Sequence, residues 1–257
     1  MCPEPLFHPW GMGERDAGDT VGAGGSAPRS FAAGFGSALL GLLLPERCVA
    51  CGGGEELLCA GCRGGLLFLR GTLCARCGCP TAWPVERCGE CAGRRLAFAS
   101  ARAAVAYDGP ARAFVSAWKE RGLRRAGSVA AELVALTVPR PPVEALTFVP
   151  GEGDRVAWRG LNTAQELARA LALRWHLPVE PLLERARSAR PQRGLPQKER
   201  AANVRGSFRA RTAVPGAVAL VDDVYTTGAT AAAAALELRR RGARSVHVVA
   251  FARAIRG

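Results

Sequence analysis

The residues best suited to chemistry lie in the stretch 218–230, which reads VALVDDVYTTGAT. Two adjacent carboxylates, Asp222 and Asp223, follow four apolar residues, and an alanine-rich helix is expected to begin near Ala229. Hydroxyl groups and backbone N–H groups between them can surround a phosphate at the start of that helix, where the helix dipole adds positive potential. The residues that offer these groups are Thr226, Thr227, Gly228, Ala229 and Thr230. Carboxylates repel a phosphate, so the Asp pair suits ribose hydroxyls or a hydrated Mg²⁺ beside it.

These residues must be positioned by a strand and by the helix that follows it. A continuous apolar strand is typical of a buried parallel sheet, and open α/β sheets bind ligands at the carboxyl ends of their strands. An ordinary strand–turn–helix corner would also tolerate two solvated acids, but it does not explain the continuation TTGAT. A Walker-type phosphate loop is excluded because no Gly-Lys-Ser/Thr follows the glycine.

Cysteines form the second group of candidate site residues. Nine of the ten cysteines lie between residues 48 and 91, eight of them in CxxC pairs. Two thiolates three residues apart converge on one ion, and two such pairs complete a tetrahedral zinc site without an open position, which indicates structural zinc. Since the cytosol keeps thiols reduced, zinc is favoured over disulfides. The predicted ligands of two zinc ions are Cys48, Cys51, Cys59, Cys62, Cys74, Cys77, Cys88 and Cys91.

Two points about these cysteines stay open in the sequence. The pairs can combine in chain order or in a crossed arrangement, because the seven-residue spacer between the first two pairs is short for a zinc ribbon. Cys79 is surplus, either as a free thiol or as a ligand in place of Cys77.

After the cysteines, strand and helix patterns alternate. This alternation predicts an α/β fold with a Rossmann-like parallel sheet and helices on both faces. Strands are expected over 101–107, 146–149, 179–183, at the motif and over 245–252, and helices over 110–121, 126–136, 162–175 and from 229 to 241.

Three segments are predicted from these patterns. Residues 1–30 lack periodicity and are expected to be either a disordered tail or a misassigned start of the sequence. Residues 31–95 comprise a short helix, from Phe31 to Leu44, and the zinc-binding module. Residues 96–257 form the α/β domain, in which 185–211 are polar and strongly basic.

Composition limits the possible partners and locations. Hydrophobic residues make up 49% of the chain, which is enough for a core, and the formal net charge of +13 makes a polyanion partner plausible. The longest apolar run, 38–44, is far shorter than the ~20 residues of a membrane span. The N-terminal residues show no signal-peptide pattern, so a cytoplasmic location without membrane insertion is expected.

With these features in order, the sequence resembles the ComF family. These are amidophosphoribosyltransferase-like proteins with an N-terminal double zinc ribbon, associated with competence and DNA uptake. The stretch 218–230 is similar to the phosphoribosyl diphosphate (PRPP) motif of type I phosphoribosyltransferases. Further similarity lies in 107–110 with Lys119, in Val149-Pro150 followed by 159–162, and in Gln192, Arg200, Asn203, Val204 and Phe208. The chain departs from the family pattern at Leu161 and Thr163, and acids stand at Glu152 and Asp154 in a loop that is usually basic.

The resemblance implies the fold of the type I phosphoribosyltransferases and specific site roles. Thr226 to Thr230 would hold the 5′-phosphate of PRPP, and Asp222 and Asp223 would bind the ribose hydroxyls. Lys119 and Arg159 would contact pyrophosphate, and Mg²⁺ would bridge pyrophosphate and ribose oxygens. The basic segment 185–211 would be a hood over the acceptor.

Three functions are compatible with this sequence. The first is an enzyme that transfers phosphoribosyl to an unknown acceptor, in DNA uptake or nucleotide metabolism. The second is a non-catalytic adaptor that binds single-stranded DNA, alongside a competence helicase. The third is a PRPP-sensing regulator that does not contact DNA.

Overall fold

The computed structural model describes residues 47–151, 160–186 and 206–255. The predicted tail over 1–30, the predicted helix over 31–44 and the centre of the predicted hood lie outside these ranges. Contacts group Pro45–Gly257 into one compact unit. The division of that unit near residue 95 stays a prediction.

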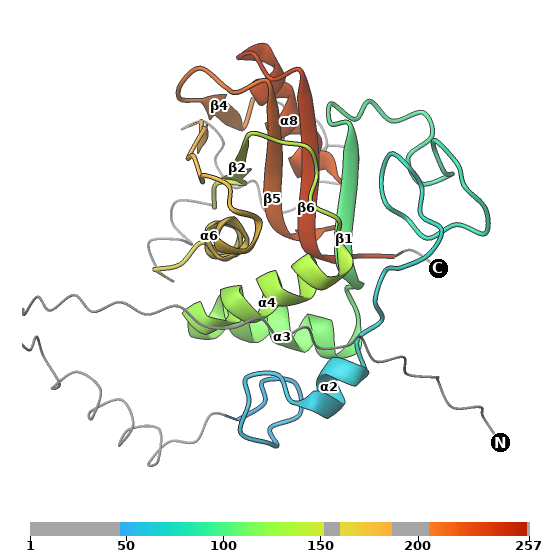
Figure 1. Cartoon of the computed structure of the whole chain (residues 1–257), viewed down its shortest axis with the longest axis vertical. Coiled ribbons are helices and arrows are strands. Elements are labelled where there is room, and N and C mark those ends of the chain that lie inside the picture. Colours follow the sequence, from blue (N-terminus) through green and yellow to red (C-terminus); the bar gives the residue numbers. More distant parts are fainter. Residues whose placement is uncertain (1–46, 152–159, 187–205, 256–257) are drawn as a thin grey trace, which may run out of the picture. The chain divides into compact units, whose positions relative to one another are not determined.

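A parallel sheet of four strands forms the centre of this unit (Figure 1). Its order is β1-β6-β5-β2, and every neighbouring pair is parallel. The strands are β1 (Ser100–Ala106), β2 (Ala145–Phe148), β5 (Ala217–Tyr225) and β6 (Ser245–Arg253). The predicted α/β fold with a parallel sheet is confirmed, and the motif acids lie near the carboxyl end of β5, a central strand.

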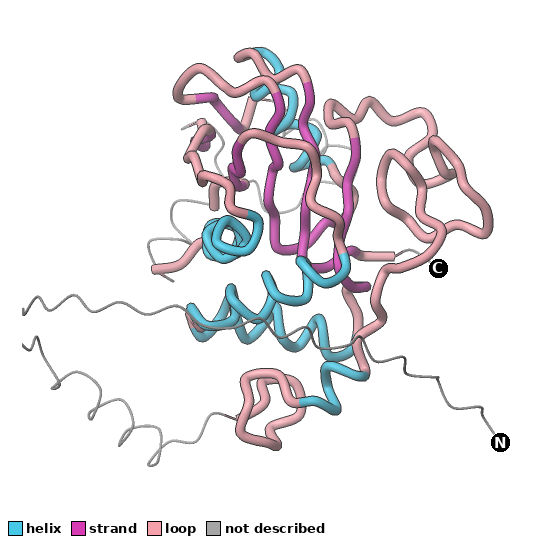
Figure 2. The backbone as a smooth tube through the Cα atoms, viewed as in Figure 1, coloured by secondary structure: helices cyan, strands magenta, loops and turns pink. Residues whose placement is uncertain are grey.

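Helices cover both faces of the sheet, as the sequence predicts (Figure 2). One face packs on α3 (Gly109–Arg121), α4 (Arg124–Thr137) and α6 (Thr163–Trp175). The other packs on α8 (Ala229–Arg240). Alternate residues of β5 serve the two faces: Ala219 and Val221 belong to the first core, and Val218 and Leu220 to the second. Because both faces are covered, the strand is apolar without interruption up to Val221.

The strand predicted over 179–183 is wrong in its position. Val179 makes only an isolated bridge with Leu146, and the regular strand is β3 (Leu183–Arg185), which pairs antiparallel with β4 (Phe208–Ala210). Pro181 has no N–H to donate, so a regular ladder starts only after it. Because β3 and β4 pair with each other, the two ends of the segment 185–211 lie side by side.

A short helix, α2 (Ala60–Gly64), lies among the cysteines and was not predicted. None of the helices in the described ranges has the length and hydrophobicity that a bilayer-spanning segment requires.

Candidate functional site

The loop between β5 and α8 has the geometry of an anion site. Gly228 is the N-cap residue of α8 and has a left-handed conformation, with φ of 73°. The Thr227 hydroxyl oxygen accepts a hydrogen bond from the N–H of Ala229 at 3.3 Å. The first N–H groups of α8 therefore lie directly after the loop, where an α-helix lacks internal acceptors for them.

Tyr225 explains why the loop requires glycine at position 228. A Cβ added to Gly228 would collide with the hydroxyl and ring of Tyr225, and the positive φ would strain any other residue. The Tyr225 ring is 4% exposed and lies against the loop from the protein side. The loop is therefore shaped by a buried aromatic side chain.

Asp223 is held by two elements on one side of the sheet. Its carboxylate is buried, and Oδ1 forms an ion pair with Nζ of Lys119 in α3 at 2.7 Å. The hydroxyl of Thr163, the first residue of α6, donates a hydrogen bond to Oδ2. The orientation of Asp223 is thus determined by α3 and α6 together.

Asp222 is half-buried and has a different electrostatic environment. Burial, and next the charge of the Asp223 carboxylate, raise the pKa of Asp222 to about 7, although Lys119 opposes this shift. Its Oδ1 accepts the N–H of Asp223 at 2.9 Å. Near neutral pH Asp222 is therefore only partly ionised.

The start of α6 completes the site in the described residues. The side chain of Asn162 caps the helix by accepting the N–H groups of Ala164 and Gln165, and its Nδ2 donates to the carbonyl of Val149 at 3.2 Å. This bond ties the end of the β2 strand to α6, so that Thr163 reaches Asp223.

The predicted site residues differ in where they lie. The structure brings Lys119, Asp223 and the loop 226–230 to the carboxyl end of β5, while Arg159 lies outside the described residues. The predicted contact of Lys119 with pyrophosphate stays a prediction. Two site residues were missed: Thr163, which binds Asp223, and Arg185, whose charge opposes the raised pKa of Asp222 and whose Nε donates to the carbonyl of Pro150 at 3.0 Å. Thr163 was noted only as a departure from the family pattern, and nothing in the sequence indicates that it contacts Asp223.

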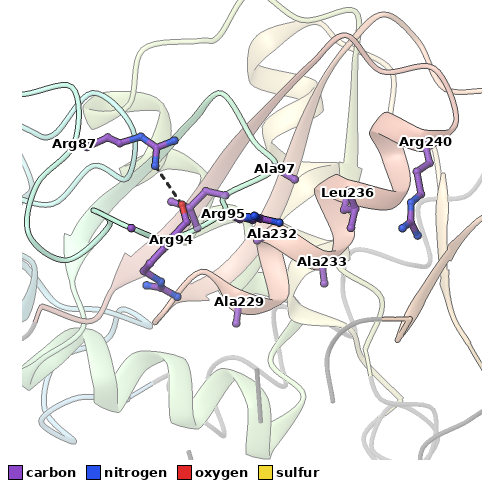
Figure 3. Close-up of a pocket in the computed structure, with 11 residues that line it drawn as sticks. Arg87, Arg94, Arg95, Ala97, Ala229, Ala232, Ala233, Leu236 and Arg240 are labelled. Atoms are coloured by element: carbon purple, nitrogen blue, oxygen red, sulfur yellow. Dashed lines mark hydrogen bonds between the residues drawn. The ribbon is translucent and has the colours of Figure 1, made fainter. Parts of the chain in front are cut away.

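A basic groove begins beside the same loop, on the outer side of α8 (Figure 3). It has a volume of about 1050 Å³, and none of the described residues that line it is acidic. Its apolar side is formed by one face of α8 that starts at Ala229 and reaches Leu236. Its cationic side chains are Arg87, Arg94, Arg95 and Arg240. Arg87 is fixed by donating to the carbonyl of Arg94 at 3.2 Å.

Eight cysteines form two tetrads, combined in chain order. Cys48, Cys51, Cys59 and Cys62 make the first tetrad, and Cys74, Cys77, Cys88 and Cys91 make the second. Within each tetrad all sulfur atoms lie within 4.8 Å of one another. The Sγ–Sγ distances of Cys74–Cys91 and Cys77–Cys88 are 3.7 and 3.5 Å, close to the ~3.8 Å expected around a tetrahedral zinc with Zn–S bonds of ~2.3 Å. The eight predicted cysteines thus form two groups of four, and of the two pairings that the sequence leaves open the structure shows the one in chain order.

The donor chemistry of the tetrads also fits zinc. Burial would raise the pKa of the Cys48 thiol, but backbone N–H groups, first that of Cys59, lower it to about 6. Cys74 has the same arrangement, with its pKa lowered to about 6 against burial by the N–H groups of Cys77 and Cys88. Each tetrad therefore stabilises one thiolate, the form that binds metal, while the pKa values of Cys62, Cys77 and Cys91 are raised. All nine cysteines of the described ranges are free of disulfides.

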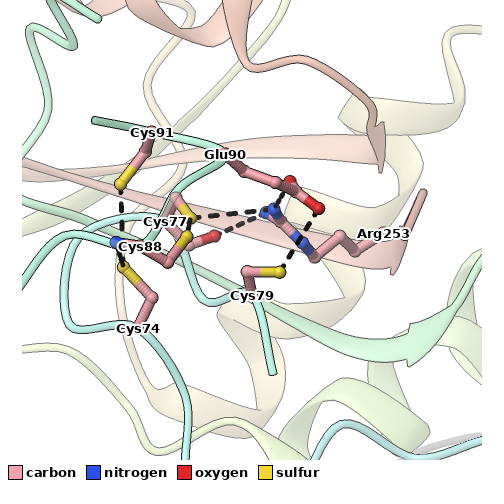
Figure 4. A network of polar contacts seen from close by, with 7 residues as sticks. All are labelled: Cys74, Cys77, Cys79, Cys88, Glu90, Cys91 and Arg253. Carbon is pink, nitrogen blue, oxygen red and sulfur yellow. Dashed lines mark hydrogen bonds and ion pairs between the residues drawn. The ribbon is translucent and has the colours of Figure 1, made fainter. Parts of the chain in front are cut away.

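Cys79 belongs to neither tetrad. Its thiol donates to Oε1 of Glu90 at 3.3 Å, and the same carboxylate pairs through Oε2 with the buried side chain of Arg253 at 2.6 Å (Figure 4). Burial and the bond to Glu90 raise the pKa of Cys79 to about 11. Cys79 therefore lies outside the second tetrad, and Cys77 is the cysteine of these two that the tetrad contains.

Comparisons with known proteins agree with the two tetrads. Residues 39–92 match the family model of the double zinc ribbon domain. Competence protein F of Haemophilus influenzae is 28% identical over 224 residues, which cover 81% of this chain and 97% of that protein. DNA utilization protein YhgH of Salmonella typhi is 29% identical over 201 residues, covering 72% of this chain and 86% of that protein.

The matching solved structures have lower sequence identity to this chain than these two relatives and cover less of it. Glutamine PRPP amidotransferase from B. subtilis, in complex with ADP and GMP, gives a TM-score of 0.33 at 22% identity, over 49% of this chain and 25% of that protein. The protein TT1426 from Thermus thermophilus gives a TM-score of 0.27 at 20% identity, over 49% of this chain and 72% of that protein. At these scores the likeness carries no argument about the site.

Proposed function

Because this chain is a homologue of competence protein F and of the DNA utilization protein YhgH, we propose that it binds PRPP or a related phosphoribosyl compound and transfers the phosphoribosyl group to an acceptor in DNA utilization. Asp222, Asp223 and the loop 226–230 would form the binding site. One observation carries this proposal. A buried carboxylate that Lys119 and Thr163 hold in place, that of Asp223, is followed within the same loop by the left-handed Gly228 that begins α8.

The loop suits the phosphate end of such a ligand. The N–H groups that begin α8 and the hydroxyls of Thr226 and Thr230 are donors, and the helix dipole favours an anion there. The absence of a side chain at Gly228 lets Tyr225 pack directly against the loop backbone, which holds the loop at the start of α8.

The acid pair suits the ribose end of the ligand. Each carboxylate oxygen can accept two hydrogen bonds, so Asp223 retains acceptor capacity after binding Lys119 and Thr163. Those two contacts fix the direction of its remaining lone pairs, which orients a bound ribose. Asp222 accepts hydrogen bonds best when ionised, so its raised pKa makes ribose binding sensitive to pH.

Mg²⁺ is the cation that the carboxylates of Asp222 and Asp223 would favour. Carboxylate oxygens are the hard ligands that Mg²⁺ prefers, usually with retained water and substrate phosphates. When bound with PRPP, Mg²⁺ would neutralise the diphosphate that leaves. The protein's own contribution would be to position the ribose and to hold the 5′-phosphate, which matches a site built from orientation and electrostatics.

Titration of the zinc-loaded full chain with ribose 5-phosphate, and with PRPP plus Mg²⁺, tests binding. Asp223→Asn and Gly228→Ala should each weaken binding by about tenfold or more, or roughly 1.4 kcal/mol. The first removes an acceptor for ribose, and the second displaces the loop through a clash with Tyr225. Glu132→Gln, which removes an ion pair with Arg63 at a distance from the loop, is the matched control. Pyrophosphate release with candidate acceptors then tests transfer, and the enzyme proposal fails if wild type and Asp223→Asn behave identically with every acceptor.

A second candidate function is the binding of single-stranded DNA, and the basic groove favours it. Four arginines beside the apolar face of α8 offer cationic contacts for backbone phosphates, and the described lining residues include no aromatic side chain on which bases could stack. The groove starts at Ala229, so a strand lying in it would pass beside the phosphate loop. Binding of DNA and of a phosphoribosyl compound are compatible in this arrangement.

A further inference from the structure

A buried arginine joins the second cysteine tetrad to the central sheet. Arg253, in β6, is 2% exposed. Its Nη1 donates to the carbonyl of Cys77 at 2.6 Å, and its Nη2 pairs with Glu90 at 2.6 Å. Both acceptors belong to the segment that forms the tetrad (Figure 4). A buried guanidinium is costly without such acceptors, so the place of Arg253 depends on the order of this segment.

The same guanidinium also contacts Tyr225. The Arg253 Cζ lies 4.8 Å from the centroid of the Tyr225 ring, in the range of a cation–π contact. The two residues are register partners at the ends of β6 and β5. Phe98, which is fully buried, meets the ring edge-on at a centroid distance of 6.2 Å. The ring of Tyr225 is thus held between Arg253 and Phe98.

Tyr225 in turn occupies the space next to Gly228. The ring and hydroxyl lie where a side chain at position 228 would have to go, so they form the inner wall of the loop. A displacement of the ring would leave Gly228, the residue with the greatest backbone freedom, without its packing contact. Consecutive contacts therefore lead from the second tetrad through Arg253 and Tyr225 to the loop 226–228.

We propose that the second cysteine tetrad, when it holds zinc, keeps the phosphate loop in its binding conformation through Arg253 and Tyr225, which are positioning residues for the ligand. This inference rests on the proposed function, because it assigns the loop to phosphate binding. The metal acts here at a distance and needs no open coordination position.

The first tetrad provides the internal comparison. Cys48 packs in the other core cluster, with residues of α3, α4 and α6. Cys74, Cys77 and Cys91 pack in the cluster that contains Tyr225 and α8. The two zinc sites are chemically alike, yet they stabilise opposite faces of the sheet, so they should differ in their effect on the loop.

Hydrogen exchange of the zinc-loaded full chain tests this difference. Cys88→Ser and Cys51→Ser should each lower the zinc content by one ion per chain. Cys88→Ser should speed amide exchange over residues 222–232 by about tenfold, whereas Cys51→Ser should change it much less. Equal acceleration in both variants would mean a general loss of stability and would overturn the proposal. No acceleration in Cys88→Ser would overturn it as well.

Substitution of Tyr225 tests the contact that reaches the loop. Tyr225→Leu leaves all eight cysteine ligands and Arg253 in place, so zinc content should stay at that of wild type. Exchange over 222–232 should speed up, and ribose 5-phosphate should bind about tenfold more weakly. Tyr225→Phe keeps the ring, so its exchange over 222–232 and its affinity for ribose 5-phosphate should stay close to those of wild type. Wild-type behaviour of Tyr225→Leu, or equally fast exchange and weak binding in Tyr225→Phe, would refute the role of the ring.

The two readouts separate this inference from the proposed function. If wild type binds neither ribose 5-phosphate nor PRPP, the proposed function fails, while the exchange comparison still decides whether zinc in the second tetrad orders the loop.

Discussion

The ammonium group of Lys119 lies 2.7 Å from Oδ1 of Asp223, so the last turn of α3 is tied to the carboxyl end of β5. The lysine side chain is 33% exposed and the aspartate side chain only 12%. Truncation of the lysine would therefore leave a nearly buried carboxylate with the Thr163 hydroxyl as its other described partner.

A double-mutant cycle should measure this pair. We expect Lys119→Met to lower the free energy of unfolding by roughly 1–3 kcal/mol, because it leaves a buried charge without its cation. The same substitution should cost much less in an Asp223→Asn background, where no carboxylate charge remains. Urea denaturation at neutral pH gives both values. Equal losses in the two backgrounds would show that the ion pair contributes nothing to stability.

Zinc content should distinguish the tetrads from the surplus cysteine. Two zinc ions per chain are expected from the two cysteine tetrads, and Cys74→Ser should reduce this content to one. Cys79→Ser should retain both ions, since Cys79 contacts Glu90 and belongs to neither tetrad. Metal analysis of the purified proteins checks this, and loss of an ion from Cys79→Ser would contradict the assignment.

Asp222 should make stability depend on pH. Its pKa is raised from 3.8 to about 7 in the folded chain, so the folded state binds more protons than the unfolded state between these values. The free energy of unfolding should then decrease as the pH rises from about 4 to about 7 and level off above. Asp222→Asn lacks this contribution, and its melting temperature should exceed that of wild type increasingly over the same interval. If the melting temperatures of Asp222→Asn and wild type differed by the same amount at pH 4, 6 and 8, the raised pKa of Asp222 would be contradicted.

The groove arginines should contribute electrostatically to DNA binding. Replacing Arg94 and Arg95 with Ala should weaken the affinity for single-stranded DNA and reduce the slope of log K against log salt by about one per lost phosphate contact. Arg169→Ala, which removes an exposed helix arginine paired with Glu166 on α6, is the matched control. Fluorescence anisotropy at several salt concentrations measures the affinity and the slope for each variant. An unchanged slope in the variant of Arg94 and Arg95 would show that DNA does not bind in the groove.

Local sequence patterns predicted most of the fold. The apolar run before Asp222, the alanine-rich helix after Gly228 and the CxxC spacing each encode a local structure, and all three are present. The error at 179–183 is also local, because a proline interrupts an apolar segment whose regular pairing starts two residues later.

The contacts that complete the site could not be predicted in this way. Thr163 and Asp223 are 60 residues apart, and Arg253 and Cys77 are 176 residues apart. The first pair meets because β5 lies beside β2, whose end Asn162 ties to α6, and the second because β6 lies beside β1, to which the Cys77 segment is hydrogen-bonded. Periodicity identifies strands but does not specify their order, so the partners of Asp223 and the acceptors of Arg253 become visible only in three dimensions.

The bond between Arg253 and the Cys77 carbonyl also bears on the order of synthesis. The ribosome makes the second tetrad long before it makes β6, so for 176 residues of elongation the Cys77 segment lacks its guanidinium partner. We expect the nascent zinc module to reach its final stability only after β6 has joined the sheet. Until then its thiols are open to oxidation and to competing metals, and a truncated chain without β6 would keep them in that exposed condition.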